Sequence, residues 1–377
     1  MVVAHMEDHI RDKMSVYSGR LEKIRQHAED NNLEGIILVP GPNLRYVTGV
    51  NSMLMERPFL MFLSRDGGTH LVAPTLESGP YFRAPIKINV HSWEDSEGPS
   101  RAFKELVSQV HLKGKWGVEG RVPFGFIHQI HDYAHPDLTD VEKILQSIRE
   151  VKEPKEVRAL ERAASILSKS FLTIPNMLKS GITELELARK ITPTIYANGA
   201  DYVGDVLVQS GEFAADPHHL PSTRKLKRNE SIVIDTECAC SGYYSDITRT
   251  FMLGKDRAFE NLYEIVLASQ EAAIKLSNNG ATVGSIDSAA RSYLKTRGLD
   301  QYFTHRTGHG LGLEVHEAPY IVPGGEERVL PSMVFTIEPG AYIPSKMGIR
   351  IEDDILSTDR ACKNMTKALP KEFEWWT

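Results

Sequence analysis

Apolar positions in the first 150 residues recur with two different periods, one helical and one typical of strands. Residues 20–32 (RLEKIRQHAEDNN) space their apolar side chains as a helix does, whereas 35–40 (GIILVP) is a short apolar run that indicates a buried strand. Residues 58–74 are predicted to form two strands joined by an Asp-Gly-Gly turn, and 115–120 a further short strand. We therefore expect residues 1–150 to form an α/β domain with its own core.

A charged segment near residue 150 marks the predicted domain boundary. Residues 147–166 (SIREVKEPKEVRALERAASI) carry one proline among many charges, which is typical of a linker leading into a helix, here beginning near Lys155. A chain of 377 residues is long for a single core. The sequence thus predicts an N-terminal domain over 1–150 and a second domain over 151–377, both of mixed α/β class.

The second domain contains a weak internal sequence repeat. Residues 178–191 (LKSGITELELARKI) combine a helix end, a glycine-containing turn and a new helix, with Thr183 and Glu186 at capping-box spacing. Residues 276–294 (LSNNGATVGSIDSAARSYL) repeat this order with Thr282 at the helix start. The two segments are either ordinary helix–turn–helix joints or matching parts of a duplicated α/β half with a site between the copies.

Two carboxylates lie on a predicted hairpin within residues 231–253. Asp235 and Asp246 are equally distant from the Cys240–Ser241 bond, and the segments around them have strand character. If the chain folds back at that bond, the two side chains face each other with Cβ atoms about 5 Å apart. Carboxylates held so closely repel each other unless a cation lies between them, so this hairpin indicates a metal site.

A second pair of acids repeats this design near the C-terminus. In residues 333–356 (MVFTIEPGAYIPSKMGIRIEDDIL), Glu338 and Glu352 lie at equal distances from Ser345, with Pro344 and a glycine near the bend. The flanking alternation predicts a second hairpin that brings these two carboxylates together.

A glycine-rich segment, 305–319 (HRTGHGLGLEVHEAP), adds imidazoles to these acids. His309 lies between two glycines, where the bare backbone permits close approach to a ligand, and His316 follows it. The glycine spacing is wrong for a dinucleotide fingerprint, and no second histidine completes an HExxH zinc motif. The four acids favour a role for His309 in the same site.

Composition narrows the class of protein. A net charge of −6 argues against a general nucleic-acid binder, and no apolar run approaches the ~20 residues needed to span a membrane. The N-terminal residues lack a secretory apolar core, and three cysteines fit a reducing compartment, so we expect a cytoplasmic protein. Cys238 and Cys240 are expected in or near the hairpin turn, and no second Cys/Cys or Cys/His pair completes a zinc site around them.

Four carboxylates and one imidazole make a mostly oxygen donor set. Such a set suits two divalent ions, Mn²⁺ or Co²⁺ with Fe²⁺ or Zn²⁺ as alternatives, better than a structural zinc. Two ions ~3.5–4 Å apart can share a water molecule and lower its pKa toward neutrality. The pattern predicts metal-assisted hydrolysis of a polar carbonyl or phosphoryl compound.

With these residues in view, the chain resembles the pita-bread metallopeptidases, the family of prolidase, aminopeptidase P, methionine aminopeptidase and creatinase. The resemblance rests on the order Asp, Asp, His, Glu, Glu and on the segments GYYSDITRTF (242–251), GHGLGLEVHE (308–317), IEPGAYIP (337–344) and NLRYVTGV (43–50). It implies a creatinase-like N-terminal α/β domain, a C-terminal pita-bread domain with pseudo-twofold duplicated halves, and a homodimer. It also implies cleavage of small peptides with proline in the second position, as in Xaa-Pro dipeptidases.

The resemblance assigns roles position by position. Asp235 would bind one ion, Asp246 and Glu352 would bridge two ions, and His309 with Glu338 would complete the second ion site. Glu338 would also receive the proton of the bridging water as a metal-bridging hydroxide attacks the scissile carbonyl.

The remaining assignments concern the substrate and the support of the ligands. His218, in the segment ADPHHLP, and His316 would orient the substrate and stabilise the tetrahedral intermediate. Thr248 and Arg350 would hydrogen-bond near the metal ligands.

Two departures from the family pattern leave alternatives open. Glu237 stands where a glycine is typical and could crowd the metal centre or add a ligand to it, which keeps a relative with a non-peptide substrate, such as a lyase, in view. Tyr320 stands where prolidase-like members often carry an arginine for the dipeptide carboxylate, so an Xaa-Pro aminopeptidase acting on longer peptides is an alternative. The alternative from another class is a metal-free peptide-binding module on the same fold.

Overall fold

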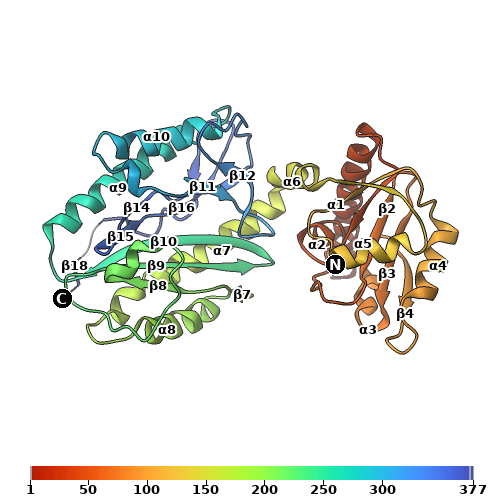
Figure 1. The fold of residues 1–377 in the computed structure, drawn as a ribbon, viewed down its shortest axis with the longest axis horizontal. Coiled ribbons are helices and arrows are strands. Elements are labelled where there is room, and N and C mark those ends of the chain that lie inside the picture. The colour runs from red at the N-terminus through yellow and green to blue at the C-terminus, as the bar shows by residue number, and fades with distance from the viewer. Residues whose placement is uncertain (1, 373–374, 377) are drawn as a thin grey trace. The chain divides into compact units, whose positions relative to one another are not determined.

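The computed structural model describes residues 2–372 and 375–376, which divide into two compact units, Met1–Ile148 and Arg149–Thr377. Figure 1 shows the helices and strands of each unit. Within the described chain no helix combines the length and apolar character that crossing a membrane requires.

The first unit is built on a mixed sheet. Its strand order is β4-β3-β2-β1-β5-β6, with β2 and β3 forming the antiparallel hairpin expected over 58–74. The strands are β1 (Gly35–Leu38), β2 (Leu60–Ser64), β3 (Thr69–Pro74), β4 (Asn89–Trp93), β5 (Lys115–Val118) and β6 (Asp137–Asp140). The helices are α1 (Val2–Asp30), α2 (Pro42–Thr48), α3 (Thr75–Ser78), α4 (Ser100–Gln109), α5 (Phe124–His131) and α6 (Glu142–Glu150). All four residues of β1 are buried, as their apolar run predicts.

The predicted linker is shorter than expected. Residues 147–150 belong to helix α6, and only three residues separate it from α7 (Pro154–Phe171). Pro154 occupies the first turn of α7, and Glu153 and Glu156 satisfy each other's backbone N–H groups in a capping box. The helix predicted to begin near Lys155 thus begins at Pro154, and the linker is limited to residues 151–153.

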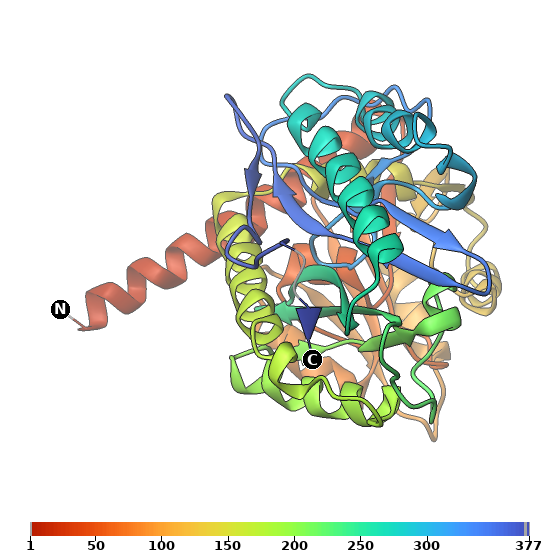
Figure 2. The same ribbon diagram turned by 90° about the vertical axis from the view of Figure 1, so that its left-hand side faces the viewer.

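The second unit repeats one arrangement of helices and strands. Its first half contains α7, α8 (Glu184–Ala197), β7 (Tyr202–Val203), β8 (Leu207–Ser210), β9 (Ser231–Cys240) and β10 (Tyr243–Leu253). Its second half contains α9 (Arg257–Leu276), α10 (Val283–Lys295), β11 (Gly308–Gly310), β12 (Glu317–Ile321), β13 (Val334–Ile337), β14 (Gly340–Ile343), β15 (Met347–Arg350), β16 (Asp353–Leu356) and β17 (Lys363–Asn364). In Figure 1, α7 and α8 lie on one side of the strands and α9 and α10 on the other, and Figure 2 shows the same order after a quarter turn.

The internal sequence repeat corresponds to this duplicated arrangement of helices and strands. Thr183 caps α8 by accepting a hydrogen bond from Glu186, and Thr282 caps α10 by accepting one from Ser285. Each cap residue also forms an isolated antiparallel bridge, Thr183 with Lys225 and Thr282 with Arg328. The two halves have separate apolar cores, one around α7, α8 and β9 and the other around α9, α10 and β13.

The first acidic hairpin has a different register from the predicted one. Asp246 lies opposite Glu237, and Asp235 lies opposite Thr248. The chain folds back at Ser241 and Gly242, which both have positive φ (54° and 79°), as the tight two-residue turn of a hairpin requires. The predicted direct pairing of Asp235 with Asp246 is therefore wrong, because the turn is centred between Ser241 and Gly242, one residue later than predicted. The residues that form the turn set the register, and the equal spacing of the acids does not.

The second acidic hairpin has the predicted register. Gly340 pairs with Arg350 on one side of the two glutamates, and Ile337 pairs with Asp353 on the other. Both pairings are symmetric about Ser345, whose φ is 58°. Glu338 and Glu352 thus lie at matching positions, in the interruption between the two ladders.

Candidate metal centre

Five candidate ligands come together from separate parts of the second unit. Asp235 is on β9, Asp246 on β10 and His309 on β11, while Glu338 directly follows β13 and Glu352 directly precedes β16. The first half of the unit thus supplies two carboxylates, and the second half supplies the imidazole and two further carboxylates.

The ligand atoms form overlapping groups. One oxygen each of Asp235, Asp246 and Glu352 lie within 4.8 Å of one another, and so do ligand atoms of His309, Glu338 and Glu352. The Nε2 atom of His309 lies 3.4 Å from Oε1 of Glu338 and 3.8 Å from Oδ2 of Asp246. Two ligand groups that share Glu352 are the arrangement that two neighbouring ions need.

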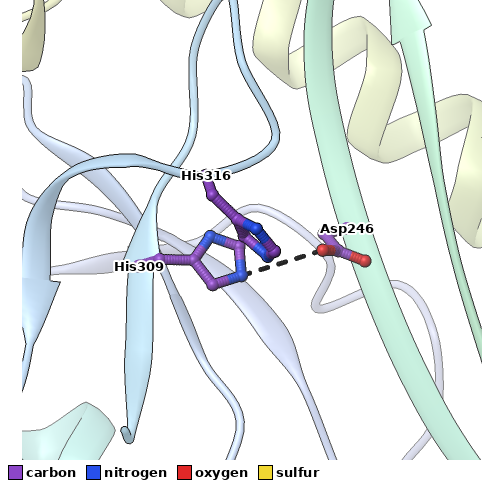
Figure 3. Close-up of side chains that lie close together, drawn as sticks. All are labelled: Asp246, His309 and His316. Carbon is purple, nitrogen blue, oxygen red and sulfur yellow. Dashed lines mark ion pairs between the residues drawn. The ribbon is translucent and has the colours of Figure 1, made fainter. Parts of the chain in front are cut away.

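A further group extends the site toward His316. Ligand atoms of Asp246, His309 and His316 also lie within 4.8 Å of one another. Figure 3 shows the two imidazoles side by side, with His309 directed at Asp246; the ring centroids are 4.1 Å apart and the rings nearly perpendicular. His316 therefore lies at the edge of the metal centre, where it can contact either an ion or a bound molecule.

Burial and mutual repulsion shift the pKa values of these carboxyl groups. Burial raises the pKa of Asp246 well above its usual range, and the charge of Glu352 raises it further. Burial, followed by the charge of Glu338, has the same effect on the pKa of Glu352. Burial also raises the pKa of Glu338 to about 7. Without a cation, burial and mutual repulsion thus favour the protonated forms of these carboxyl groups.

The pKa of the His309 imidazole shifts in the opposite direction. Burial, followed by the neighbouring His316, lowers the pKa of His309 well below its usual value. His309 is therefore neutral at physiological pH, which is the form that binds metal ions.

One buried oxygen supports the fit of a metal ion directly. Asp246 is only 7% exposed, and its Oδ1 atom has no hydrogen-bond partner among the described residues. Leaving a carboxylate oxygen buried and unpaired is costly unless a cation compensates it. The donor set and this oxygen together fit divalent ions.

Arg350 and Thr248 hold the carboxylates in place. Arg350 donates from Nη2 to Oδ2 of Asp235 at 2.7 Å, from Nε to Oγ1 of Thr248 at 3.0 Å and from Nη1 to the Tyr342 hydroxyl at 2.9 Å. Thr248 in turn donates to Oε2 of Glu352 at 2.6 Å. Ligands from the two halves of the unit are thus linked through one guanidinium group and one hydroxyl.

Glu237 adds a carboxylate beside the ligands. It shares the Asp235 face of β9, and burial, followed by the charge of Asp235, raises its pKa to about 7. Gly204 makes room for it, since a Cβ atom at that glycine would lie 1.7 Å from Oε1 of Glu237. Glu237 belongs to none of the ligand groups found among the described residues and lines the cavity beside them.

The ligands open into a cavity of about 710 Å³ that also contains His218, His316 and Glu237. His218 is exposed on the cavity wall, whereas the adjacent His219 stacks on Phe213 and lies 3.2 Å from Glu184. Of the two neighbouring histidines, only His218 faces the cavity.

The sequence reasoning did not identify Arg306, which lines the same cavity. Its Cζ atom lies 4.8 Å from the centre of the Tyr320 ring, and Tyr320 pairs with His309 across β11 and β12. The available signal was the position of Arg306 in the segment HRTGHG (305–310), three residues before His309.

The cysteines lie at the end of strand β9 close to the hairpin turn, as expected, with Cys240 directly before the turn residue Ser241. Cys238 and Cys240 alternate with Asp235 and Glu237, so their side chains point to the opposite face, into the apolar core. Cys238 donates a weak hydrogen bond to the carbonyl of Ala163. In the described part of the chain no cysteine belongs to a group of potential metal ligands.

Comparison with known proteins adds a family to this geometry. The profile of metallopeptidase family M24 matches residues 158–359, and that of the creatinase/prolidase N-terminal domain matches residues 20–151. The chain is 34% identical to the probable dipeptidase PepE of Mycobacterium bovis over 349 residues, which cover 91% of this chain and 92% of that protein. It is 31% identical to the Xaa-Pro dipeptidase of Pyrococcus horikoshii over 360 residues, which cover 94% of this chain and 98% of that one. The crystal structure of recombinant prolidase from Thermococcus sibiricus superimposes with a TM-score of 0.90 at 34% identity, covering 95% of this chain and 98% of that one.

Proposed function

The chain belongs to metallopeptidase family M24, and from this premise we propose that it is a dinuclear-metal Xaa-Pro dipeptidase. In this proposal residues 151–377 form the catalytic domain and residues 1–150 a creatinase/prolidase-type N-terminal domain. The relatives named Xaa-Pro dipeptidase and prolidase support a substrate with proline in the second position.

The observation that carries the proposal is the buried, unpaired Oδ1 atom of Asp246 within the convergent ligand groups. Asp235, Asp246, His309, Glu338 and Glu352 would hold two divalent ions, Mn²⁺ or Co²⁺ with Fe²⁺ or Zn²⁺ as alternatives. When bound, such ions supply a water molecule of lowered pKa as nucleophile and polarise the scissile carbonyl.

The side chains in and around the ligand set would transfer protons, orient the substrate and position the ligands. Glu338 lines the cavity beside the other ligands, where it would take up the proton of the attacking water and release it to the leaving amine. His218 and His316 line the cavity beside the ligands and would orient the substrate carbonyl and stabilise its developing negative charge. Arg350 and Thr248 would keep Asp235 and Glu352 in position.

Three alternatives make different predictions. An Xaa-Pro aminopeptidase would cleave Ala-Pro-Ala and leave Ala-Pro intact. A lyase that uses Glu237 in the same site would leave all peptides intact while still binding metal. A metal-free peptide-binding module would take up no divalent ion, and the complete ligand set speaks against it.

The test is a panel of Xaa-Pro peptides assayed after reconstitution with each of the four ions, with chelator-treated protein as the control. We expect hydrolysis of Ala-Pro that depends on added metal. Glu338→Gln, which preserves size and removes the carboxylate, should abolish this activity. Cleavage of Ala-Pro-Ala with an inert Ala-Pro would overturn the dipeptidase assignment in favour of the aminopeptidase.

Two further parts of the proposal concern assembly and compartment. A homodimer is expected from the family resemblance, and size-exclusion chromatography with light scattering tests it. The cytoplasm remains the predicted compartment because the described cysteines, Cys238, Cys240 and Cys362, are all free thiols.

A further inference from the structure

The loop that carries His316 ends at a buried carboxylate. His316 is exposed in the cavity and directly precedes β12, whereas Glu317, the first residue of β12, is only 2% exposed. Successive side chains of an extended chain point in opposite directions, so the burial of Glu317 directs His316 toward the cavity. The position of the Glu317 side chain therefore determines where the His316 imidazole lies.

The bend over residues 312–316 closes around the Glu317 carboxylate. Gly312 leaves room for it, since a Cβ atom at that glycine would lie 2.2 Å from Oε1 of Glu317. Glu314 donates its backbone N–H to Oε2 of Glu317 at 3.4 Å. The carbonyl of Gly312 accepts a hydrogen bond from the backbone N–H of Tyr244, on β10, at 2.9 Å. The loop is thus held by Glu317 at one end and by β10 at the other.

The charge that balances Glu317 comes from the linker over residues 151–153. Lys152 donates from Nζ to Oε1 of Glu317 at 2.7 Å, and its side chain is only 1% exposed. Arg149 lies 3.4 Å from Oε2 of Glu317 and also pairs with Glu314. Removing one partner of a buried ion pair leaves an uncompensated charge, so Lys152 and Glu317 depend on each other.

Lys152 is itself held within the second unit. Its backbone N–H donates to the carbonyl of Ser332 at 3.0 Å, and Val151 forms an antiparallel bridge with Met333, directly before β13. The ammonium group therefore reaches Glu317 from a fixed stretch of backbone. Residue 152 lies between the residues matched by the two family profiles, 20–151 and 158–359, so neither match includes it.

His316 in turn lies against a metal ligand. Its ring centroid is 4.1 Å from that of His309, and the two rings are nearly perpendicular (Figure 3). Ligand atoms of Asp246, His309 and His316 lie within 4.8 Å of one another. A displacement of about 1 Å in a group this close to the reacting atoms can cost about 100-fold in rate. A contact that fixes His316 is therefore a contact that affects the reaction.

We propose that the buried ion pair between Lys152 and Glu317 holds the 312–316 bend and thereby positions His316 for catalysis. This inference rests on the proposed peptidase function, in which His316 orients the substrate and stabilises its developing charge. It makes Lys152 and Glu317 positioning residues that act through His316, and it makes the linker part of the support of the active site.

The first experiment measures hydrolysis of Ala-Pro by the metal-reconstituted full chain. Lys152→Met removes the ammonium and keeps an unbranched side chain, and it should lower kcat by about 10- to 100-fold with a smaller change in KM. Lys152→Arg should recover part of this loss, because it restores the charge. In a His316→Ala background, Lys152→Met should cause no further loss in kcat, since residues that act through one another are not additive.

The second experiment does not depend on activity. Hydrogen exchange followed by mass spectrometry compares the metal-loaded wild-type protein with Lys152→Met. The backbone amides of residues 311–317 should exchange about tenfold faster in the variant, whereas those of β9 and β10 should be unchanged. This measurement tests the anchoring of the loop even if the substrate of the enzyme is not an Xaa-Pro peptide.

A matched control separates the buried pair from an ordinary ion pair. Lys363 donates to Glu161 at 2.6 Å in the same unit, but the two side chains are 57% and 36% exposed. Lys363→Met should change neither kcat nor the exchange of residues 311–317, because exposed pairs contribute little. Metal content and circular dichroism identify a variant that fails to fold. If Lys152→Met fails, the double variant Lys152→Met/Glu317→Gln, which leaves neither member of the pair charged, replaces it in both experiments.

Three outcomes would overturn the inference. An unchanged kcat in folded, metal-loaded Lys152→Met would show that the pair does not position His316. Equal losses from Lys152→Met in the wild-type and His316→Ala backgrounds would mean that Lys152 acts on stability or through another residue. Unchanged exchange of residues 311–317 would show that the ion pair does not hold the loop. A wild-type protein that binds metal but cleaves no Xaa-Pro peptide would instead refute the proposed function, and faster exchange in the variant would still support the anchoring.

Discussion

Replacing Asp246 by asparagine should stabilise the metal-free protein and destabilise the metal-loaded one. Oxygens of Asp235, Asp246 and Glu352 lie within 4.8 Å of one another. Two ionised groups at that distance repel each other by about 3 kcal/mol at an effective dielectric constant near 20. The variant removes one of the three charges and keeps the size of the side chain.

The pH dependence follows from the direction of the shift. Burial, followed by the charge of Glu352, raises the pKa of Asp246 in the folded state. The stability associated with its protonated form is present below the unfolded-state pKa and is lost as the pH rises through the higher folded-state pKa. The metal-free wild-type protein should therefore weaken as the pH rises above the ordinary pKa of an aspartate, and Asp246→Asn should remove part of this loss. We expect the metal-free variant to be about 1–3 kcal/mol more stable than the wild type at pH 8.

Metal should reverse this order. An ion at one hundred times its dissociation constant stabilises the folded wild-type chain by about 3 kcal/mol, and the variant lacks one of its ligands. Urea unfolding, followed by tryptophan fluorescence at pH 6 and pH 8 with chelator or with Mn²⁺, measures both states.

Asp353→Asn is the matched control for this experiment. Asp353 is buried but paired, with Arg249 at 2.8 Å and Lys371 at 3.1 Å. Its replacement should cost about 3–5 kcal/mol with or without metal, because it leaves buried positive charge without its partner. The reasoning is refuted if Asp246→Asn destabilises the metal-free protein as Asp353→Asn does, or if Mn²⁺ stabilises Asp246→Asn as much as the wild type.

Three further variants test separate parts of the structure. Thr248→Val deletes the hydroxyl that donates to Glu352 and should lower kcat on Ala-Pro by about tenfold with little change in KM, so an unchanged kcat at equal metal content would argue against positioning. Burial raises the pKa of Glu119 to about 7, so the wild-type protein should lose about 3 kcal/mol of stability between pH 4 and pH 8. Glu119→Gln should not show this loss in urea unfolding. The same dependence of stability on pH in both proteins would contradict the prediction. Thr183→Ala and Thr282→Ala remove equivalent helix caps, and each should cost about 1 kcal/mol in thermal unfolding; a loss from only one would show that the caps are not energetically equivalent.

The sequence indicated which acids point to the same side of each hairpin, because strand alternation fixes which side chains share a face. The register of the second hairpin followed from its symmetry about Ser345. The first hairpin departed from the same logic, since Ser241 and Gly242 form the turn and bring Glu237, not Asp235, opposite Asp246. The residues of the turn therefore determined the register of the first hairpin, which the spacing of the acids did not predict.

The placement of the cysteines shows the same principle. The sequence argued against a zinc site for Cys238 and Cys240 and placed them in or near the turn, but it did not give the face of the strand on which their side chains lie. Since β9 continues to Cys240, alternation carries both thiols to the face opposite Asp235. The extension of β9 to Cys240 depends on its pairing with β10, which the sequence alone does not give.

The contacts of the arginines could not be predicted from the sequence. Arg350 joins Asp235, which is distant along the chain, and Arg306 meets Tyr320 across two segments that only the folded sheet brings together. Such contacts depend on tertiary distances and side-chain directions that spacing does not encode. The sequence identified Tyr320 as a departure from the family pattern, and the structure identifies the neighbouring charge.

The most direct test of the proposed dinuclear centre is the number of divalent ions that one chain binds. Elemental analysis after Mn²⁺ or Co²⁺ reconstitution and dialysis should give two ions per wild-type chain and fewer in Glu352→Gln, whose side chain belongs to both ligand groups. Hydrolysis of Ala-Pro should rise with this occupancy. A wild-type chain that retains no divalent ion, or a Glu352→Gln chain that retains the full complement, would contradict the account.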